Sequence, residues 1–332
     1  MSTATAPGHK FACIALENVS VTSLNAPIQL QGGLEIHSDP PFAIGSRWIK
    51  RLGTLNTEHL KGSNFAILAT APSARLEVLD KENETLEQAA LGFFYALLMQ
   101  GVPHMDGGLI LSGANVGGDP NVRSVTVLGN YYRPAHVLPL RIDARTIASA
   151  STVAAGLRSI YEAPDAFSRL KRGVHAWYRG VREERANDRV HQFVRAIEAM
   201  LKPAAGRTRR QFVHRCQVFA GTSQQVGGLL GELFDLRSCA EHLHDWDCGL
   251  EAIPEQDRER HGSLRAYQAE LLAGLAYSRL LSNPSLLGNF QDDASIEALW
   301  RRPLPAIQTM WGQASDLDAL ASKRFRFRRP QP

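Results

Sequence analysis

The chain has 332 residues, of which 44% are hydrophobic and 21% are charged, and its formal net charge is +4. This composition excludes a disordered or fibrous protein, and the length suggests about two domains. No apolar run reaches the ~18 residues that a membrane-spanning helix needs, and no secretory signal is visible. Four cysteines are too few and too irregularly spaced for a disulfide framework. We therefore expect a reduced, cytoplasmic protein without membrane segments.

The first 142 residues predict an α+β domain of sensing or scaffolding type. Short runs rich in β-branched and aromatic residues recur between Gly, Pro and Asn. One amphipathic helix interrupts them at residues 85–100, with Thr85 as N-cap and Gly101 as C-cap. Because the runs alternate only loosely, we expect a mixed sheet. The expected strands are residues 11–16, 64–70, 75–79, 108–111 and 122–132, with a hairpin turn between Leu111 and Val122.

From residue 143 onward, apolar residues recur with the period of an α-helix, and prolines fall between the periodic segments. Residues 143–185 are interpreted as a helical connector. Residues 186–332 predict an all-α helical bundle that ends in a basic C-terminal tail. The expected helices are residues 143–160, 165–182, 188–201, 208–219, 226–236, 238–250 and 264–281.

One stretch of the helical half, Phe-Asp-Leu-Arg-Ser-Cys-Ala-Glu-His-Leu-His, suggests chemistry rather than packing. Ser238 and Glu241 match the Ser-x-x-Glu capping box of a helix start. If a helix begins there, Arg237 and His242 take positions whose side chains meet, beside free backbone amides. A guanidinium, an imidazole and a helix N-terminus together suit a phosphodiester. On a continuous helix His244 would share the face of Arg237 instead, so both histidines remain candidates and His242 is favoured.

These residues resemble the Arg-x4-His motif of HEPN domains, many of which are ribonucleases. The lead-in Phe-Asp-Leu-Arg-Ser resembles the Tyr-x-Leu-Arg-Ser of the ApeA-like branch, and residues 190–200 resemble its Phe-x-x-Ala-x-Glu-x-Leu helix. The resemblance covers residues 186–290. The bare spacing also occurs between Arg209 and His214, so the flanking residues carry the resemblance.

The resemblance implies a metal-independent RNA endonuclease that needs no cofactor and acts as a homodimer. Arg237 would stabilise the scissile phosphate, and His242, or else His244, would act as acid or base. Ser238 would orient the site, while Glu198 and Glu241 would support it. Relatives of this kind are toxins and abortive-infection effectors of bacterial antiviral defence, so RNA, with tRNA among the candidates, and a companion protein are the implied partners.

Basic residues cluster at two further places. Arg207, Arg209, Arg210 and Arg215 lie just before the motif, and the tail at residues 323–329 alternates basic residues with two phenylalanines. Such clusters neutralise phosphates and stack on bases, which predicts RNA binding. The alternative is a solvated helix face and a frayed chain end.

Two other interpretations of the motif remain open. Arg237 could be a packing brace paired with Glu198 or Asp235, in a non-catalytic module for dimerisation or partner binding. Cysteine and histidine side chains of the motif could also bind zinc. Because two of these ligands would crowd one helical turn, we expect no metal site. The four possible zinc ligands are Cys239, His242, His244 and Cys248.

Overall fold

The structure is a computed structural model that describes residues 6–22, 24, 27–42, 46–117, 119–242, 244 and 246–327. The chain forms two compact units. One unit comprises Met1–Asn130 with Leu140–Ala154, and the other comprises Tyr131–Pro139 with Ala155–Pro332. An α+β N-terminal part followed by a helical C-terminal part is therefore confirmed.

A six-stranded sheet in the order β2-β3-β4-β1-β5-β6 forms the centre of the N-terminal unit. Every neighbouring pair of these strands is antiparallel, so the expectation of a mixed sheet is wrong. β5 and β6 form the expected hairpin, but β5 continues to Val116 and the turn contains Gly117 at φ 67°. The strands are β1 (His9–Glu17), β2 (Ile28–Leu30), β3 (Leu34–His37), β4 (Ser63–Pro72), β5 (Gly107–Val116) and β6 (Asp119–Val127).

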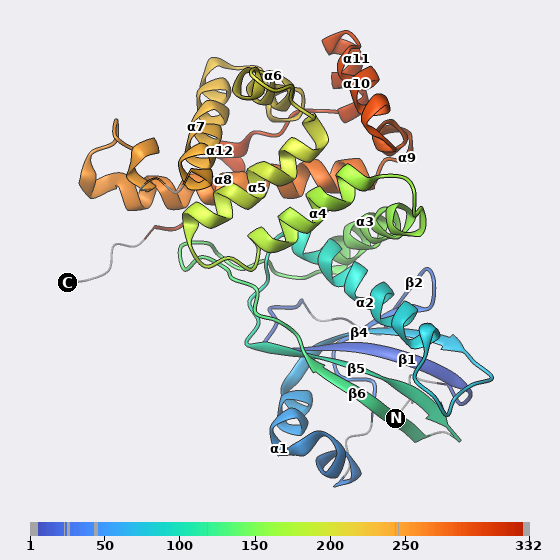
Figure 1. The fold of residues 1–332 in the computed structure, drawn as a ribbon. Coiled ribbons are helices and arrows are strands. Elements are labelled where there is room, and N and C mark those ends of the chain that lie inside the picture. The colour runs from blue at the N-terminus through green and yellow to red at the C-terminus, as the bar shows by residue number, and fades with distance from the viewer. Residues whose placement is uncertain are drawn as a thin grey trace. The chain divides into compact units, whose positions relative to one another are not determined.

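Two helices cover opposite faces of this sheet (Figure 1). Helix α1 (Ser46–Gly62) closes a core that includes Phe11, Leu68 and Leu111. Helix α2 (Lys81–Gln100) covers the other face, where every second residue of β1 and β4 is buried. Both faces of the central strands are therefore apolar. For this reason their sequences do not alternate between polar and apolar residues.

Several N-terminal expectations are wrong in detail. Residues 75–79 form a turn, since Val78 and Leu79 are exposed and bury no apolar face. α2 begins earlier than expected because Asp80, rather than Thr85, accepts the capping hydrogen bond, from Glu82 N. Gly101 is the C-cap as expected. The sequence interpretation missed β2, β3 and α1.

Most of the helices expected between residues 143 and 281 are present, but the helix expected at residues 238–250 is absent and the one expected at residues 264–281 begins at residue 255. The short helices after residue 281 were not expected. The long helices are α3 (Ala144–Glu162), α4 (Ser168–Gly180), α5 (Ala186–Leu201), α6 (Thr208–Ala220), α7 (Gln224–Glu241) and α8 (Glu255–Leu281). The short ones are α9 (Pro284–Leu287), α10 (Asp293–Trp300), α11 (Leu304–Trp311) and α12 (Leu317–Arg324), with 3-10 turns η1 (Trp246–Gly249) and η2 (Gly288–Phe290).

Helix α7 is continuous where two helices were expected, so the capping box at Ser238 is wrong. The buried residues Leu229, Leu233, Leu236 and Cys239 repeat every three or four positions, and this apolar stripe continues through Ser238. The serine that caps α7 is Ser223, whose hydroxyl accepts a hydrogen bond from Val226 N at 3.2 Å. Ser238 therefore lies in the last turn of a helix and not at its start.

Helices α4, α5 and α8 pack closely around one another. Gly173 permits this approach, because a Cβ there would overlap the Tyr277 hydroxyl and Ala199. The same hydroxyl donates to Ala196 O at 2.8 Å. A buried ion pair joins α5 to α8: Arg189, only 1% exposed, donates to the Glu270 carboxylate and to the carbonyl oxygens of Tyr132 and Glu183.

The described part of the basic tail is docked onto the helical unit. Phe325 packs with Val137 and Tyr267, and it pairs with Val137 as an isolated antiparallel bridge. The ring of Phe327 packs against that of His136 at a tilt of 40°, with ring centroids 4.3 Å apart. Its Arg326 side chain donates to carbonyl oxygens of the same segment. The expectation of a frayed end is therefore wrong for residues 323–327; residues 328 and 329 lie outside the described part.

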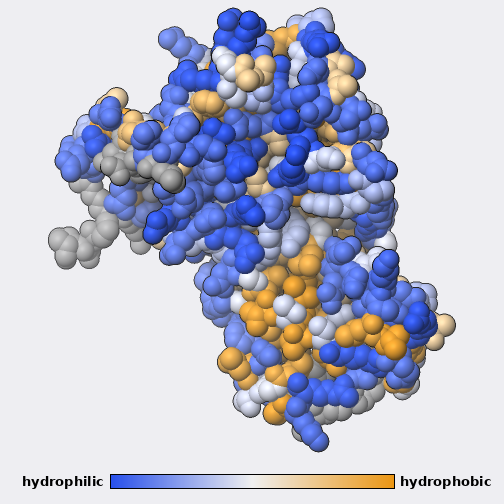
Figure 2. Space-filling view, in the orientation of Figure 1, coloured by the Kyte–Doolittle hydropathy of each residue, from blue (hydrophilic) through white to orange (hydrophobic). Residues whose placement is uncertain are grey.

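The surface of the helical unit in view is mostly hydrophilic, whereas hydrophobic residues gather on the N-terminal unit (Figure 2). Within the described residues, no helix combines the length and the apolar character needed to cross a membrane. Large exposed hydrophobic residues of the N-terminal unit include Leu55, Val78, Leu79, Val116 and Val127.

The buried Arg189–Glu270 pair gives a test of the fold. Replacing Arg189 with leucine leaves the Glu270 carboxylate buried without its cation, and we expect a loss of about 3–5 kcal/mol in the free energy of unfolding. Urea denaturation measures this loss. The matched control is Arg301→Leu, which removes an exposed partner of Glu297 and should cost less than about 1 kcal/mol. Equal losses in the two variants would contradict the assignment.

Candidate functional site

The Arg237 side chain lies at the contact between α7 and α5. Its Nη2 donates to the Glu198 carboxylate on α5 at 3.2 Å and lies 3.6 Å from Glu241 on its own helix. The guanidinium also lies over the Phe234 ring, 5.8 Å from its centroid. One fifth of the Arg237 side chain is exposed. Among the described residues, only Nη2 of this guanidinium has a recorded hydrogen bond, and Nε is buried without one.

A histidine that the sequence interpretation left without a role completes this cluster. His191 Nε2 lies 2.5 Å from the Glu241 carboxylate, so Glu241 joins the imidazole to the guanidinium. His191 and Glu198 are seven residues apart on α5 and therefore share one face of that helix. We call Arg237, Glu198, Glu241 and His191 the α5–α7 cluster.

The two carboxyl groups of the α5–α7 cluster have opposite electrostatic environments. Burial raises the pKa of Glu198, while the charge of Arg237 opposes that rise. The hydrogen bond with His191 lowers the pKa of Glu241, helped by the charges of Arg237, His191 and Arg195. A desolvated carboxyl beside an ionised one is common at functional sites and also in structural ion-pair networks.

The favoured histidine, His242, lies at the end of α7 and not opposite Arg237. It is the C-cap residue, and its backbone N–H donates to Ser238 O at 3.1 Å. It lies five positions after Arg237, and this spacing on a helix rotates the two side chains apart by ~140°. His242 and His244 are both exposed, and their ring centroids are 6.2 Å apart. The expected meeting of the Arg237 and His242 side chains is therefore wrong, because no helix starts here.

A disulfide links the end of α7 to the 3-10 turn η1. Cys239 and Cys248 form a disulfide with a Cα–Cα distance of 6.4 Å, so the expectation of a reduced chain is wrong for this pair. While this bond is intact, neither sulfur is a thiolate ligand, so the four-ligand zinc site is not formed. Within the described residues, no group of three or more His, Cys, Asp or Glu side chains is arranged to hold a metal ion.

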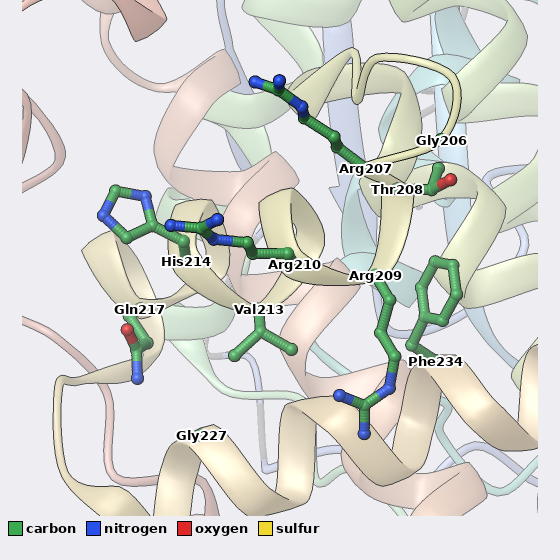
Figure 3. A pocket seen from close by; sticks show the side chains of 10 residues that line it. All are labelled: Gly206, Arg207, Thr208, Arg209, Arg210, Val213, His214, Gln217, Gly227 and Phe234. Carbon is green, nitrogen blue, oxygen red and sulfur yellow. The ribbon is translucent and has the colours of Figure 1, made fainter.

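Three of the four predicted RNA-binding arginines line a cavity of about 690 Å³ between α6 and α7 (Figure 3). Arg209 pairs with Asp235 through two hydrogen bonds of 2.7 and 2.8 Å. Arg207 and Arg210 are exposed. Arg215 is not among the lining residues, because it donates to the carbonyl oxygens of Leu201 and Lys202 at the end of α5. RNA binding by these arginines stays a prediction.

Phe234 connects the cavity to the α5–α7 cluster. Phe234 lines the cavity, and its ring contacts both Phe212 of α6 and the guanidinium of Arg237. Arg237 follows Phe234 by three residues, so it lies about one turn further along α7. Cationic groups therefore extend from the start of α6 to the last turn of α7.

Two histidines became visible as site residues only in the structure. The seven-residue spacing between His191 and Glu198 could have indicated a shared helix face. His214 lines the cavity, although its spacing from Arg209 was interpreted as chance. Its nearer basic neighbour is Arg210, four residues earlier on the same face of α6.

Comparisons of this chain with protein-family models, with curated proteins and with solved structures gave no match.

The Glu241 environment predicts a pH-dependent stability. Since the folded-state pKa of Glu241 is lowered from 4.5, its ion pairs stabilise the fold above the unfolded value and are lost as the pH falls through the folded one. Glu241→Gln should therefore cost up to about 1 kcal/mol at pH 7, a small value because the side chain is 39% exposed. The cost should shrink as the pH falls below 4.5 and vanish once the pH lies below the lowered folded-state pKa of Glu241. Urea titrations at a series of pH values measure it; a pH-independent cost would contradict the assigned contacts.

Proposed function

We propose that the chain is a metal-independent RNA endonuclease of a bacterial antiviral-defence or toxin system, working in the cytoplasm as a homodimer. One observation carries the proposal: Arg237 is held by carboxylates of two helices at a partly exposed point, next to a cationic cavity. The resemblance to HEPN ribonucleases gives Arg237 its proposed role at the scissile phosphate. RNA, including tRNA, would approach along Arg207 and Arg210.

The proposed reaction is an attack within the RNA itself. The ribose 2′-hydroxyl loses its proton to a base and bonds to the adjacent phosphorus, while the bond to the 5′-oxygen breaks and that oxygen takes a proton. A cyclic 2′,3′-phosphate and a free 5′-hydroxyl result. Imidazoles can exchange both protons, and an arginine stabilises the extra negative charge on the phosphate.

The histidine assignment has three candidates in the proposed enzyme. His191 lies in the α5–α7 cluster through Glu241, whereas His242 and His244 are exposed at the end of α7. In the proposed homodimer, His242 of one copy would act beside Arg237 of the other. Ser238, half-buried in the last turn of α7, would help orient this region.

A non-catalytic module for dimerisation or partner binding is the second candidate function. It is favoured by the ion pair of Arg237 with Glu198, which braces α7 against α5, and by the burial of four fifths of the Arg237 side chain. In that case the carboxylates of the α5–α7 cluster serve packing alone, and the N-terminal unit and a companion protein would supply any activity.

Cleavage assays separate these two functions. We expect the purified protein to cleave tRNA or total RNA in the presence of a chelator, leaving cyclic phosphate ends. Arg237→Lys retains a positive charge but loses the planar fork, and should lower the cleavage rate at least ~100-fold. Single replacements of His191, His242 and His244 by alanine should identify the acid or base by a loss of about 100-fold or more.

The matched control for Arg237 is Arg301→Lys, since Arg301 also pairs with a carboxylate four residues away, Glu297. It should cleave at the wild-type rate. Thermal unfolding of each variant shows whether a lost activity reflects a lost fold. Cleavage that the chelator abolishes, or that Arg237→Lys leaves unchanged, overturns the proposed chemistry.

A further inference from the structure

The cavity between α6 and α7 is lined in part by apolar and hydrogen-bonding residues to which the cleavage proposal gives no role. Its volume is about 690 Å³, within the ~300–1,000 Å³ typical of small-molecule sites. Figure 3 shows the side chains of Arg207, Arg210 and His214 on one side of the view and Phe234 on the other. The cavity is lined by Gly206, Arg207, Thr208, Arg209, Arg210, Val213, His214, Gln217, Gly227 and Phe234.

Some of the arginines at this cavity have a carboxylate partner and others do not. Asp235 neutralises Arg209 through a bidentate pair. Within the described residues, no carboxylate is recorded as a partner of Arg207 or Arg210. His214 lies one helical turn beyond Arg210, so its ring can add a hydrogen bond on the same face. Two free guanidinium groups beside an imidazole favour a doubly charged phosphate group.

The remaining lining favours an organic group attached to that phosphate. Val213 and Phe234 provide an apolar wall, and Gln217 and Thr208 provide hydrogen-bonding groups. The space exists partly because α7 has a glycine at position 227. A Cβ on Gly227 would lie 3.2 Å from Gln217 Nε2, so any larger side chain there would enter the cavity.

We propose that this cavity binds a small organic phosphate monoester of the size of a nucleoside 5′-monophosphate. The phosphate lies against Arg207, Arg210 and His214, and the organic group lies against Val213 and Phe234. This binding does not depend on RNA cleavage by the chain. It assigns to the cavity a small ligand that would share Arg207 and Arg210 with the RNA proposed to approach Arg237.

Calorimetric titration of the full chain with adenosine 5′-monophosphate tests the proposal. We expect saturable binding by the wild type, at least ~10-fold weaker binding of inorganic phosphate, and no binding of adenosine. The double variant Arg207→Gln, Arg210→Gln should bind the monophosphate at least ~10-fold more weakly, since each lost charge-assisted contact contributes about one decade or more in affinity.

Two further variants separate binding in the cavity from a general effect of charge. Gly227→Leu fills the cavity without changing any charge and should weaken binding at least ~10-fold. Arg301→Gln removes an exposed arginine outside the lining and should leave the affinity within about two-fold. Absent binding by the wild type, unchanged binding by Gly227→Leu, or an equal loss in Arg301→Gln overturns the proposal. Because the readout is nucleotide binding, failure here is distinct from failure of RNA cleavage.

Discussion

The contact of Arg237 with Glu198 fixes α7 against α5, and both proposed sites include residues of α7. It joins α7 to α5 across a partly buried boundary, and the pair of His191 with Glu241 repeats the connection one turn further along α7. As α5 proceeds from His191 to Glu198, its partners on α7 run back from Glu241 to Arg237, so the two helices pass in opposite directions. An arginine suits this position because it can satisfy two carboxylates and still retain unused N–H groups.

Bracing and catalysis make different demands on the same guanidinium. A brace needs only its carboxylate partners, whereas a phosphate-binding arginine also needs a solvent path and free donors. One fifth of the Arg237 side chain is exposed, and its neighbour Phe234 lines the cationic cavity between α6 and α7. The burial that raises the pKa of Glu198 also strengthens its attraction to Arg237. The position of Arg237 is thereby fixed before any ligand arrives.

Helical periodicity predicted the long helices from α3 to α6 closely, since amphipathic stripes such as that of α5 are local features, but it did not predict the short helices α9 to α12. The sheet was harder, because strands apolar on both faces show no alternation and the short β2 and β3 depend on pairing with β4. The Ser-x-x-Glu pattern at Ser238 misled because the buried stripe from Leu229 to Cys239 outweighed a local capping signal. The pairing of Arg237 with Glu198 was among the expected contacts, but His191 required the relative placement of two helices.

The most direct test of Arg237 as a phosphate-binding group is a crystal structure with a 2′-O-methyl RNA dinucleotide, which lacks the attacking hydroxyl. We expect the bridging phosphate to accept hydrogen bonds from the Arg237 guanidinium while Glu198 stays on Nη2. We also expect an imidazole, from this chain or from a second copy, beside the methylated 2′-oxygen or the 5′-oxygen. A dinucleotide that binds elsewhere, with no hydrogen bond from Arg237 to its phosphate, would contradict this role. Arg237 would then be a brace between α7 and α5 alone.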